Sequence, residues 1–269
     1  MKSPRKLTIR DIAEAAGVSP ATVSLVLNGK GEISGVIALG TELTEGDIRL
    51  IQGLGLPTVF IDTFYEVVDA NFVDMNNEDA VYKVLSRFQK QGFQRIGFVA
   101  SHVDTTNFRL RRDAFFKNMT RLGLPVKEAD ILSVESTYDG AYLDTRALLS
   151  NGLELAECYF CTNDIIAYGF IRALREHGLS IPDDVSIIGF DNLPQSATMD
   201  PGLTTIDVSK RKIGYLAVTV LDDLIAAAEP QPPVKILVGA DLVLRASHER
   251  AAARPARERP SKKMRLPAE

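Results

Sequence analysis

The chain has 269 residues, of which 45% are apolar and 25% are charged, and this is a globular composition. No run of about 18 apolar residues occurs, and Met1 is followed by Lys2, Pro4 and Arg5. The sequence therefore predicts neither a membrane span nor a secretory signal. We expect a cytoplasmic protein made of one small module and one larger α/β domain.

The formal net charge of −4 is unevenly distributed along the chain. Residues 1–30 carry five Lys or Arg against two Asp or Glu, and residues 249–269 carry seven against three, so the acidic groups are concentrated between them. A basic first module on an acidic body favours a protein whose first module meets phosphate.

The first thirty residues predict two short helices joined by a tight turn. Thr8 begins the first helix and Gly17 ends it with a left-handed residue. Ser19 caps the second helix, with Pro20 at its first position, and Asn28 closes it. This pattern is typical of a helix-turn-helix, in which the second helix enters the major groove of DNA. The alternative is a capped helical hairpin without a role in DNA binding.

From Gly35 onward, apolar runs alternate with amphipathic stretches. The expected strands are Val36–Leu39, Thr58–Ile61, Phe72–Val73, Arg95–Ala100, Ile131–Val134, Cys158–Cys161 and Val185–Phe190. The expected helices are Glu45–Leu54, Glu78–Gln91, Phe108–Leu122, Asp139–Leu149 and Ile165–His177. Since most of the strands are apolar on both faces, the sequence predicts an α/β fold with parallel sheets covered by helices.

Polar side chains follow several of these strands. They are Asp62, Ser101, His102, Asn163, Asp164, Asp191 and Asn192. Ligands of such folds bind outside the carboxyl ends of the strands, so we expect one cleft there, faced by Arg109 and Arg111. Carboxylates, amides and guanidinium groups together can hold vicinal hydroxyls. For Asp164 and Asn192, a role as helix cap or turn former is an equal alternative.

The two cysteines form a Cys-x-x-Cys motif, but they lie in an apolar strand. Their odd spacing places Cys158 and Cys161 on opposite faces of that strand. We therefore expect no redox chemistry, no metal site and no cofactor.

The string from Leu7 to Gly29 closely resembles the headpiece of the lactose-repressor family. The segments 109–115, 161–169, 181–192 and 201–206 look like the effector-domain signatures of that family, which is related to periplasmic sugar receptors. The resemblance implies a helix-turn-helix followed by a doubly wound receptor domain of the type I periplasmic-binding-protein-like fold.

Carried over position by position, the resemblance implies two sets of contacts with DNA. Pro20, Ala21 and Leu25 occupy base-reading positions, and Thr8, Ser19, Thr22, Ser24 and Asn28 occupy positions that touch the backbone or orient the helix. None of the three base-reading side chains can form a bidentate hydrogen bond, so readout would rest on thymine methyl groups and DNA shape.

The resemblance also implies an effector site. Arg111, Asn163 and Asp191 match ligand-binding positions of the family, and Asp62 matches a polar contact from the other lobe. Tyr138 matches an aromatic residue that stacks on the ligand, and Arg109 is a weaker match.

The chain departs from the family pattern after Asn28-Gly29. Residues 30–34 lead directly into a segment that looks like the third strand of the receptor, and a third headpiece helix, a hinge helix and two βα units are missing. At about 30 residues for each βαβ unit, the gap is roughly 80 residues. We expect a weakened N-terminal lobe of three strands, with Val36–Leu39 as an uncovered edge. The other lobe, about 95–205 with return strands over 234–244, is expected to be complete.

The predicted organisation is therefore a partial DNA-binding headpiece over 1–30, an effector-binding receptor domain over 35–248 and a disordered basic tail over 249–269. The first hypothesis is a regulator, acting as a repressor, whose partners are operator DNA, a sugar or polyol effector and a second copy of the chain. The second hypothesis is a sugar-binding receptor without DNA function. The third, an enzyme on a doubly wound fold, is disfavoured because the G-x-S-x-G, P-loop and H-E-x-x-H motifs do not occur in the sequence.

Overall fold

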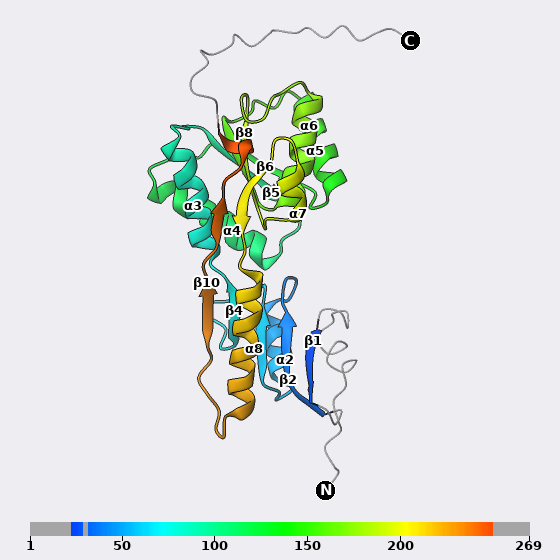
Figure 1. The fold of residues 1–269 in the computed structure, drawn as a ribbon, viewed down its shortest axis with the longest axis vertical. Coiled ribbons are helices and arrows are strands. Elements are labelled where there is room, and N and C mark those ends of the chain that lie inside the picture. The colour runs from blue at the N-terminus through cyan, green and yellow to red at the C-terminus, as the bar shows by residue number, and fades with distance from the viewer. Residues whose placement is uncertain (1–22, 29–31, 250–269) are drawn as a thin grey trace.

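The computed structural model describes residues 23–28 and 32–249, which form two lobes stacked along the long axis of the molecule (Figure 1). Each lobe is built around one sheet. No helix within the described ranges is long and apolar enough to cross a membrane.

The N-terminal lobe contains a five-stranded sheet in the order β1-β2-β3-β4-β10. The strands are β1 (Val23–Asn28), β2 (Glu32–Leu39), β3 (Thr58–Ile61), β4 (Asn71–Met75) and β10 (Lys235–Val238). All neighbours pair in parallel except β1, which is antiparallel to β2.

Two helices cover this sheet, one on each face. Because successive side chains of a strand alternate, Val36 and Ala38 pack with α2 (Glu45–Gln52), whereas Ile37 packs with α8 (Lys210–Ala226) on the opposite face. The Thr44 side chain begins α2 with a capping box that includes Asp47. The lobe therefore retains a two-sided core.

Three expectations for the N-terminal part are wrong. The lobe has five strands and not three, because β1 and β10 join the sheet. Val23–Asn28, predicted as the end of the second DNA-binding helix, is strand β1, and Val36–Leu39 is not an uncovered edge because β1 pairs with it. The physical reason is that an unpaired strand leaves a row of backbone donors and acceptors unsatisfied. The segment Val-Ser-Leu-Val-Leu-Asn has the β-branched and apolar composition that suits a strand, so it fills that edge.

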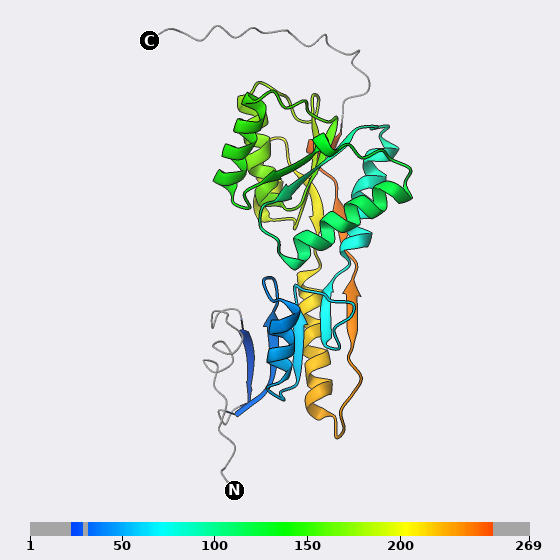
Figure 2. The same ribbon diagram turned by 180° about the vertical axis from the view of Figure 1, so that it is seen from behind.

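The C-terminal lobe contains a six-stranded sheet in the order β11-β9-β8-β7-β5-β6. Its strands are β5 (Ile96–Ser101), β6 (Ile131–Val134), β7 (Cys158–Cys161), β8 (Ser186–Phe190), β9 (Thr204–Asp207) and β11 (Asp241–Val243). Its helices are α3 (Asn77–Lys90), α4 (Thr106–Arg121), α5 (Tyr138–Ser150), α6 (Asp164–Glu176) and the short α7 (Pro194–Thr198), with 3-10 turns at Glu128–Asp130 and Ala246–His248. Helices α3 and α4 lie on one side of the sheet, and α5 and α6 lie on the other (Figure 2).

The core of this lobe confirms that the two cysteines point in opposite directions. Both are fully buried, but Cys158 packs in the cluster that contains α3 and α4, and Cys161 packs in the cluster that contains α5 and α6. Burial raises the pKa of the Cys161 thiol well above its usual value. This thiol is therefore inert core packing at neutral pH.

The chain crosses between the lobes after β4, after β9 and after β10 (Figure 1). The return strands over 234–244 were both predicted in the C-terminal lobe, and this is wrong for the first of them. β10 pairs with β4 in the N-terminal lobe, and only β11 pairs with β9. The remaining predicted strands and helices from Thr58 to His177 are confirmed within a few residues, whereas α7 and α8 were not predicted.

Candidate functional site

Two of the predicted site residues have a backbone conformation that only a few per cent of non-glycine residues adopt. Asp62 follows β3 with φ 57° and Asp191 follows β8 with φ 108°. Such conformations cost free energy and cluster at ligand-binding sites. Both residues stand at the carboxyl ends of parallel strands, one in each lobe.

Arg111 of α4 lies between these two aspartates and is 3% exposed. Its Nε donates to Asn77 Oδ1 at 3.1 Å and its Nη1 donates to the Thr162 carbonyl at 2.8 Å. Its Nη2 lies 3.3 Å from the Met75 sulfur and 3.5 Å from Asp191 Oδ1. The guanidinium is also stacked 3.7 Å above the Phe190 ring. Hydrogen bonds, an ion pair and ring stacking together therefore fix its position.

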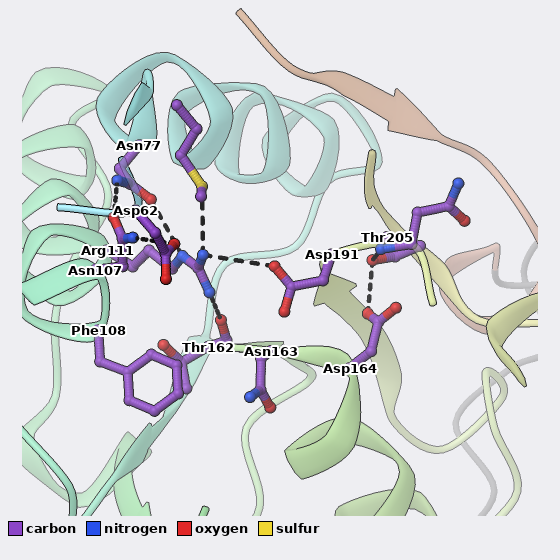
Figure 3. Close-up of polar contacts among 12 residues, drawn as sticks. Asp62, Asn77, Asn107, Phe108, Arg111, Thr162, Asn163, Asp164, Asp191 and Thr205 are labelled. Carbon is purple, nitrogen blue, oxygen red and sulfur yellow. Dashed lines mark hydrogen bonds and ion pairs between the residues drawn. The ribbon is translucent and has the colours of Figure 1, made fainter. Parts of the chain in front are cut away.

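A chain of side-chain hydrogen bonds leads from Arg111 into the N-terminal lobe (Figure 3). Asn77 Nδ2 donates to Asn107 Oδ1 at 2.7 Å, and Asn107 Nδ2 donates to Asp62 Oδ1 at 2.7 Å. The hydroxyl of Thr41 donates to the other oxygen of Asp62. This relay joins β3 of one lobe to α4 and β8 of the other.

The pKa of the Asp191 carboxyl group lies closer to neutral pH than that of an ordinary aspartate. Burial raises its pKa to about 6, although the nearby Arg111 lowers it. The ammonium of Lys210 donates to the Asp191 carbonyl at 2.8 Å, which fixes the backbone at this position.

Asp74, near the end of β4, is a fully buried carboxyl next to the same cluster. Within the described part of the chain, neither of its carboxyl oxygens forms a hydrogen bond of normal geometry. Burial raises its pKa to about 7, and the charge of Asp62 adds to the effect while Arg111 opposes it. The group is therefore partly protonated at neutral pH.

Asn163 lies next to Thr162, the backbone partner of Arg111. Its own Oδ1 accepts from the Ile166 amide at 2.9 Å, so it caps α6.

Asp164 has the turn-forming role that the sequence left as an alternative to ligand binding. Its buried carboxylate accepts from Leu193 N, Ser196 Oγ and Thr205 Oγ1 at 2.9, 2.6 and 2.6 Å. It thereby anchors the turn that follows Asp191.

Three other predicted polar residues lie outside this cluster. His102 is exposed, with a ring nitrogen 3.2 Å from the Ser133 carbonyl. The Ser101 Oγ accepts from the amide of its neighbour Val103 at 2.9 Å, within its own loop. Asn192 serves the turn, since its Nδ2 donates to Asp207 at 3.1 Å.

Two predicted effector residues are not joined to the cluster by any contact of the described chain. The Tyr138 ring is 36% exposed and faces the Arg172 guanidinium at 5.8 Å, beside a separate cavity of about 290 Å³ between α6 and α7. Arg109 lies 3.9 Å from Asp104 and 5.9 Å from the Tyr65 ring. It therefore lies at the edge between the lobes, away from Asp191.

The predicted DNA-contacting residues fall into two groups. Thr8 and the segment from Ser19 to Thr22 lie outside the described residues. Ser24, Leu25 and Asn28 lie in β1, whose backbone is paired with β2. In this conformation they do not form part of a helix.

Four members of the cluster were not predicted from the sequence: Asn77, Asn107, Asp74 and Phe190. Asp74 and Asn77 stand at the carboxyl end of a strand, so the rule that found Asp62 could have found them. Asn107 carried no such signal, because it becomes a bridge only through the contact between the lobes.

The cluster offers acceptors from three carboxyl groups and both donors and acceptors from amide groups. This arrangement suits a small ligand with several hydroxyl groups, since paired donors and acceptors can hold each of them. No group of three or more His, Cys, Asp or Glu side chains in the described ranges is placed to hold a metal ion.

Comparison with known proteins agrees with this architecture. The periplasmic binding protein-like domain matches residues 85–248, and the lacI family of bacterial regulatory proteins matches residues 8–37. The HTH-type transcriptional repressor PurR of Actinobacillus pleuropneumoniae serotype 3 (strain JL03) is 33% identical over 220 residues, which are 81% of this chain and 65% of that protein. The chain thus spans somewhat less than two thirds of the length of this relative.

Solved structures of regulators have the same fold. The regulator CelR in complex with cellobiose has a TM-score of 0.72 at 22% identity, covering 81% of this chain and 67% of CelR. A LacI regulator of Bacillus cereus subsp. cytotoxis NVH 391-98 has a TM-score of 0.73 at 25% identity, covering 81% and 77%. The periplasmic binding protein-like match covers more than half of the chain, so the chain belongs to that domain family, and its N-terminal segment matches the lacI family of bacterial regulatory proteins.

Proposed function

We propose that this protein is a transcription regulator that binds operator DNA through its N-terminal segment and a small sugar or polyol between its lobes. It acts by binding, not by catalysis, and it works in the cytoplasm, where the DNA is. The observation that carries the proposal is the hydrogen-bond relay from Asp62 through Asn107 and Asn77 to Arg111, which links the two lobes at their strand ends.

The relay supports effector control because a ligand that enters it must alter the contact between the lobes. Asp62 and Asn107 are bonded directly from one lobe to the other at 2.7 Å, so a hydroxyl group that replaces this bond changes the lobe arrangement. Asp191 and Asn163 would bind the ligand from the C-terminal lobe, while Arg111 would hold Asp191 in place. CelR, whose fold is similar, is in complex with cellobiose.

Tyr138 and Arg109 have weaker support as effector contacts, because neither touches the relay. We keep them as peripheral positions whose substitution should affect effector binding less than substitution of Asp191. The comparison of Tyr138→Ala with Asp191→Ala tests this order.

Calorimetric titration of the whole chain with a panel of neutral mono- and disaccharides tests the effector site. At least one sugar should bind, and Asp191→Ala should weaken it by tenfold or more, since a hydrogen bond to a charged group contributes about 1.5–3 kcal/mol. Asp222→Ala, on the exposed side of α8, is the matched control. Undiminished binding by Asp191→Ala would show that the site lies elsewhere.

DNA binding is proposed from the lacI match over residues 8–37. The same match supports contacts by Pro20 and Ala21 with bases and by Thr8, Ser19 and Thr22 with the backbone. The contacts of Leu25 with bases and of Ser24 and Asn28 with the backbone require that this segment leaves β1 and forms a helix. Two headpieces spaced about one helical turn apart are needed to meet both half-sites, so we propose that the active form is a homodimer.

A second candidate, a sugar receptor without DNA function, is favoured by one observation. Val23–Asn28 cannot be both strand β1 and part of a DNA-reading helix. We therefore expect this chain to bind DNA weakly, with the salt dependence of phosphate contacts. A titration against promoter fragments over a range of salt tests this, beside a version in which a family hinge and two βα units are restored. Tight, sequence-selective binding by the short chain would contradict it.

A further inference from the structure

Asp74 departs from the rule that buried polar groups have hydrogen-bond partners. It is 0% exposed, and in the described part of the chain neither of its carboxyl oxygens accepts a hydrogen bond of normal geometry. The relay that supports the proposed function does not include it. An ionised carboxylate held in this way is strongly destabilised, since it has lost its hydration without gaining a partner.

The register of the sheet places a second carboxyl group beside it. Val73 pairs with Ile61 of β3, so the residues that follow, Asp74 and Asp62, lie next to each other where the two strands end. On the other side, the register partner of Asp74 is Leu237 of β10, which carries no charge. The charge of Asp62 disfavours ionisation of Asp74.

The C-terminal lobe faces this strand end. The strands β4 and β10 are parallel and run toward that lobe (Figure 1), and its helix α4 brings Arg111 and Asn107 close to Asp74. Arg111 is already paired with Asp191 at 3.5 Å, and Asn107 already donates to Asp62 at 2.7 Å. Asp74 is therefore covered by groups of α4 that have other partners.

The N-terminal lobe provides no ion-pair partner for Asp74 within the described ranges. The ammonium of Lys235 on β10 donates to the carbonyls of Tyr65 and Glu66. The Tyr65 hydroxyl lies 3.2 Å from the Thr106 hydroxyl of α4, so this loop also closes the junction between the lobes. Among the described groups, a negative charge on Asp74 is thus not neutralised by an ion pair from either lobe.

The protonation state of Asp74 therefore bears on the contact between the lobes. The neutral carboxyl group tolerates burial, whereas the ionised one requires water. Because Asp62 and Leu237 flank it within the sheet, water reaches it most directly at the end of β4, where α4 of the other lobe stands. Ionisation favours the arrangement in which the lobes have separated there, since a state that solvates the charge gains population. Burial raises the pKa of Asp74 to about 7, so this change falls near neutral pH.

We propose that Asp74 is a proton-operated latch between the two lobes: its neutral form holds them together, and its ionised form lets them part. The proposal rests on the lobe contact alone and holds whether or not a sugar binds. Because the proposed effector site lies at the same junction, the proton and the effector act on one equilibrium between lobe arrangements.

The magnitude follows from the two pKa values of the group. In the closed arrangement the pKa is about 7, and in contact with water it approaches the usual 3.8. The closed arrangement is therefore most favoured at low pH, and the ratio of open to closed molecules rises as the pH increases from about 4 to about 7 and then levels off. Between pH 5 and pH 8 the rise should be about tenfold to hundredfold, and the upper figure applies when the open form is fully hydrated.

The test is the labelling rate of Thr106→Cys by a methanethiosulfonate reagent. Thr106 is 3% exposed at the start of α4, so its replacement reacts when the lobes part. The rate is divided by that of Thr106→Cys with Asp74→Asn at the same pH, because the titration of the new thiol cancels in this ratio. The ratio should rise by tenfold or more between pH 5 and pH 8. The native Cys158 and Cys161 are fully buried, and the chain without the new thiol gives their background rate.

A second position separates lobe opening from unfolding. Thr145 is 0% exposed, and its hydroxyl donates to the Ala141 carbonyl of the same helix, so Thr145→Cys is labelled only when this lobe unfolds. Thr106→Cys should react faster than Thr145→Cys, because local opening requires less free energy than unfolding. The Thr145→Cys rate also shows whether Asp74→Asn is folded, and Asp74→Leu is a second neutral variant.

Two controls exclude other titrating groups. Asp191, whose pKa is raised to about 6, is present in both proteins, so its titration cancels in the ratio. The exposed Asp222→Asn should keep the rise seen with Asp74 in place. A ratio that does not change with pH would overturn the proposal, and so would equal labelling rates at positions 106 and 145.

Discussion

Replacement of Asp74 by asparagine should make the protein more stable at pH 8 and leave its stability nearly unchanged at pH 4. The buried carboxyl has a pKa of about 7 in the folded chain against a usual value of 3.8. A difference of this size corresponds to about 4 kcal/mol, at 1.36 kcal/mol for each unit. Because the folded state retains the proton longer than the unfolded state, this group lowers the free energy of unfolding as the pH rises from about 4 to about 7.

Asparagine stays neutral over this whole range, so Asp74→Asn removes the penalty. The gain at pH 8 should approach 2 to 4 kcal/mol, because the new amide also has to find hydrogen-bond partners. Urea unfolding of both proteins at pH 4, 5, 6, 7 and 8 measures the difference directly. The raised pKa of Asp191 contributes to the pH dependence of both proteins alike, so it cancels in the comparison.

The exposed Asp222→Asn is the control for the change of net charge, and its effect should be within about 0.5 kcal/mol at every pH. A stability difference between wild type and Asp74→Asn that is the same at pH 5 and pH 8 would refute the reasoning. Loss of stability in Asp74→Asn at pH 8 would show that the ionised carboxylate is satisfied in the fold.

Three further predictions concern other parts of the structure. Arg111→Met should destabilise the protein by about 3 kcal/mol, since it leaves the Asn77 and Thr162 oxygens without their donor and the partly buried Asp191 without its cation. Thermal unfolding measures this, and a change below about 0.5 kcal/mol would contradict it. Gly169→Ala should lower the free energy of unfolding by about 1 to 3 kcal/mol, because the added methyl group would collide with the backbone of α5. Urea unfolding measures this, and an unchanged midpoint would disprove the close packing. Leu25 and Val36 are partners in the β1–β2 register, so cysteines placed at both positions should form a disulfide that mass spectrometry detects. Cysteines at Leu25 and Ile37 should not form one, and the opposite result would exclude this register.

Much of the two-lobed fold could be predicted from the sequence because its signals are local. The apolar runs at Thr58–Ile61, Ile131–Val134 and Cys158–Cys161 begin and end as observed, since a proline or a polar residue stands directly before and after each of them. Asp62 and Asp191 were found from their positions at the carboxyl ends of parallel strands, one in each sheet, where ligands of such folds bind.

The relay was only partly predictable. Asn107 and Asn77 lie 30 residues apart and are bonded only because α3 and α4 pack side by side against the same sheet. Tyr138 shows the opposite case: its position follows a strand as expected, but the packing of α5 on α6 turns its ring toward Arg172.

The sequence by itself determined the alternation of helices and strands, the covered sheets and the strand-end aspartates, because all of these depend on neighbours within a few residues. Only the tertiary structure decided the state of Val23–Asn28, whose apolar residues suit a helix face and a strand equally well. The edge of β2 resolved that ambiguity, since pairing satisfies backbone groups that are distant in sequence. The same holds for the division of β10 and β11 between the two sheets, where long-range hydrogen bonds, not local composition, assign each strand.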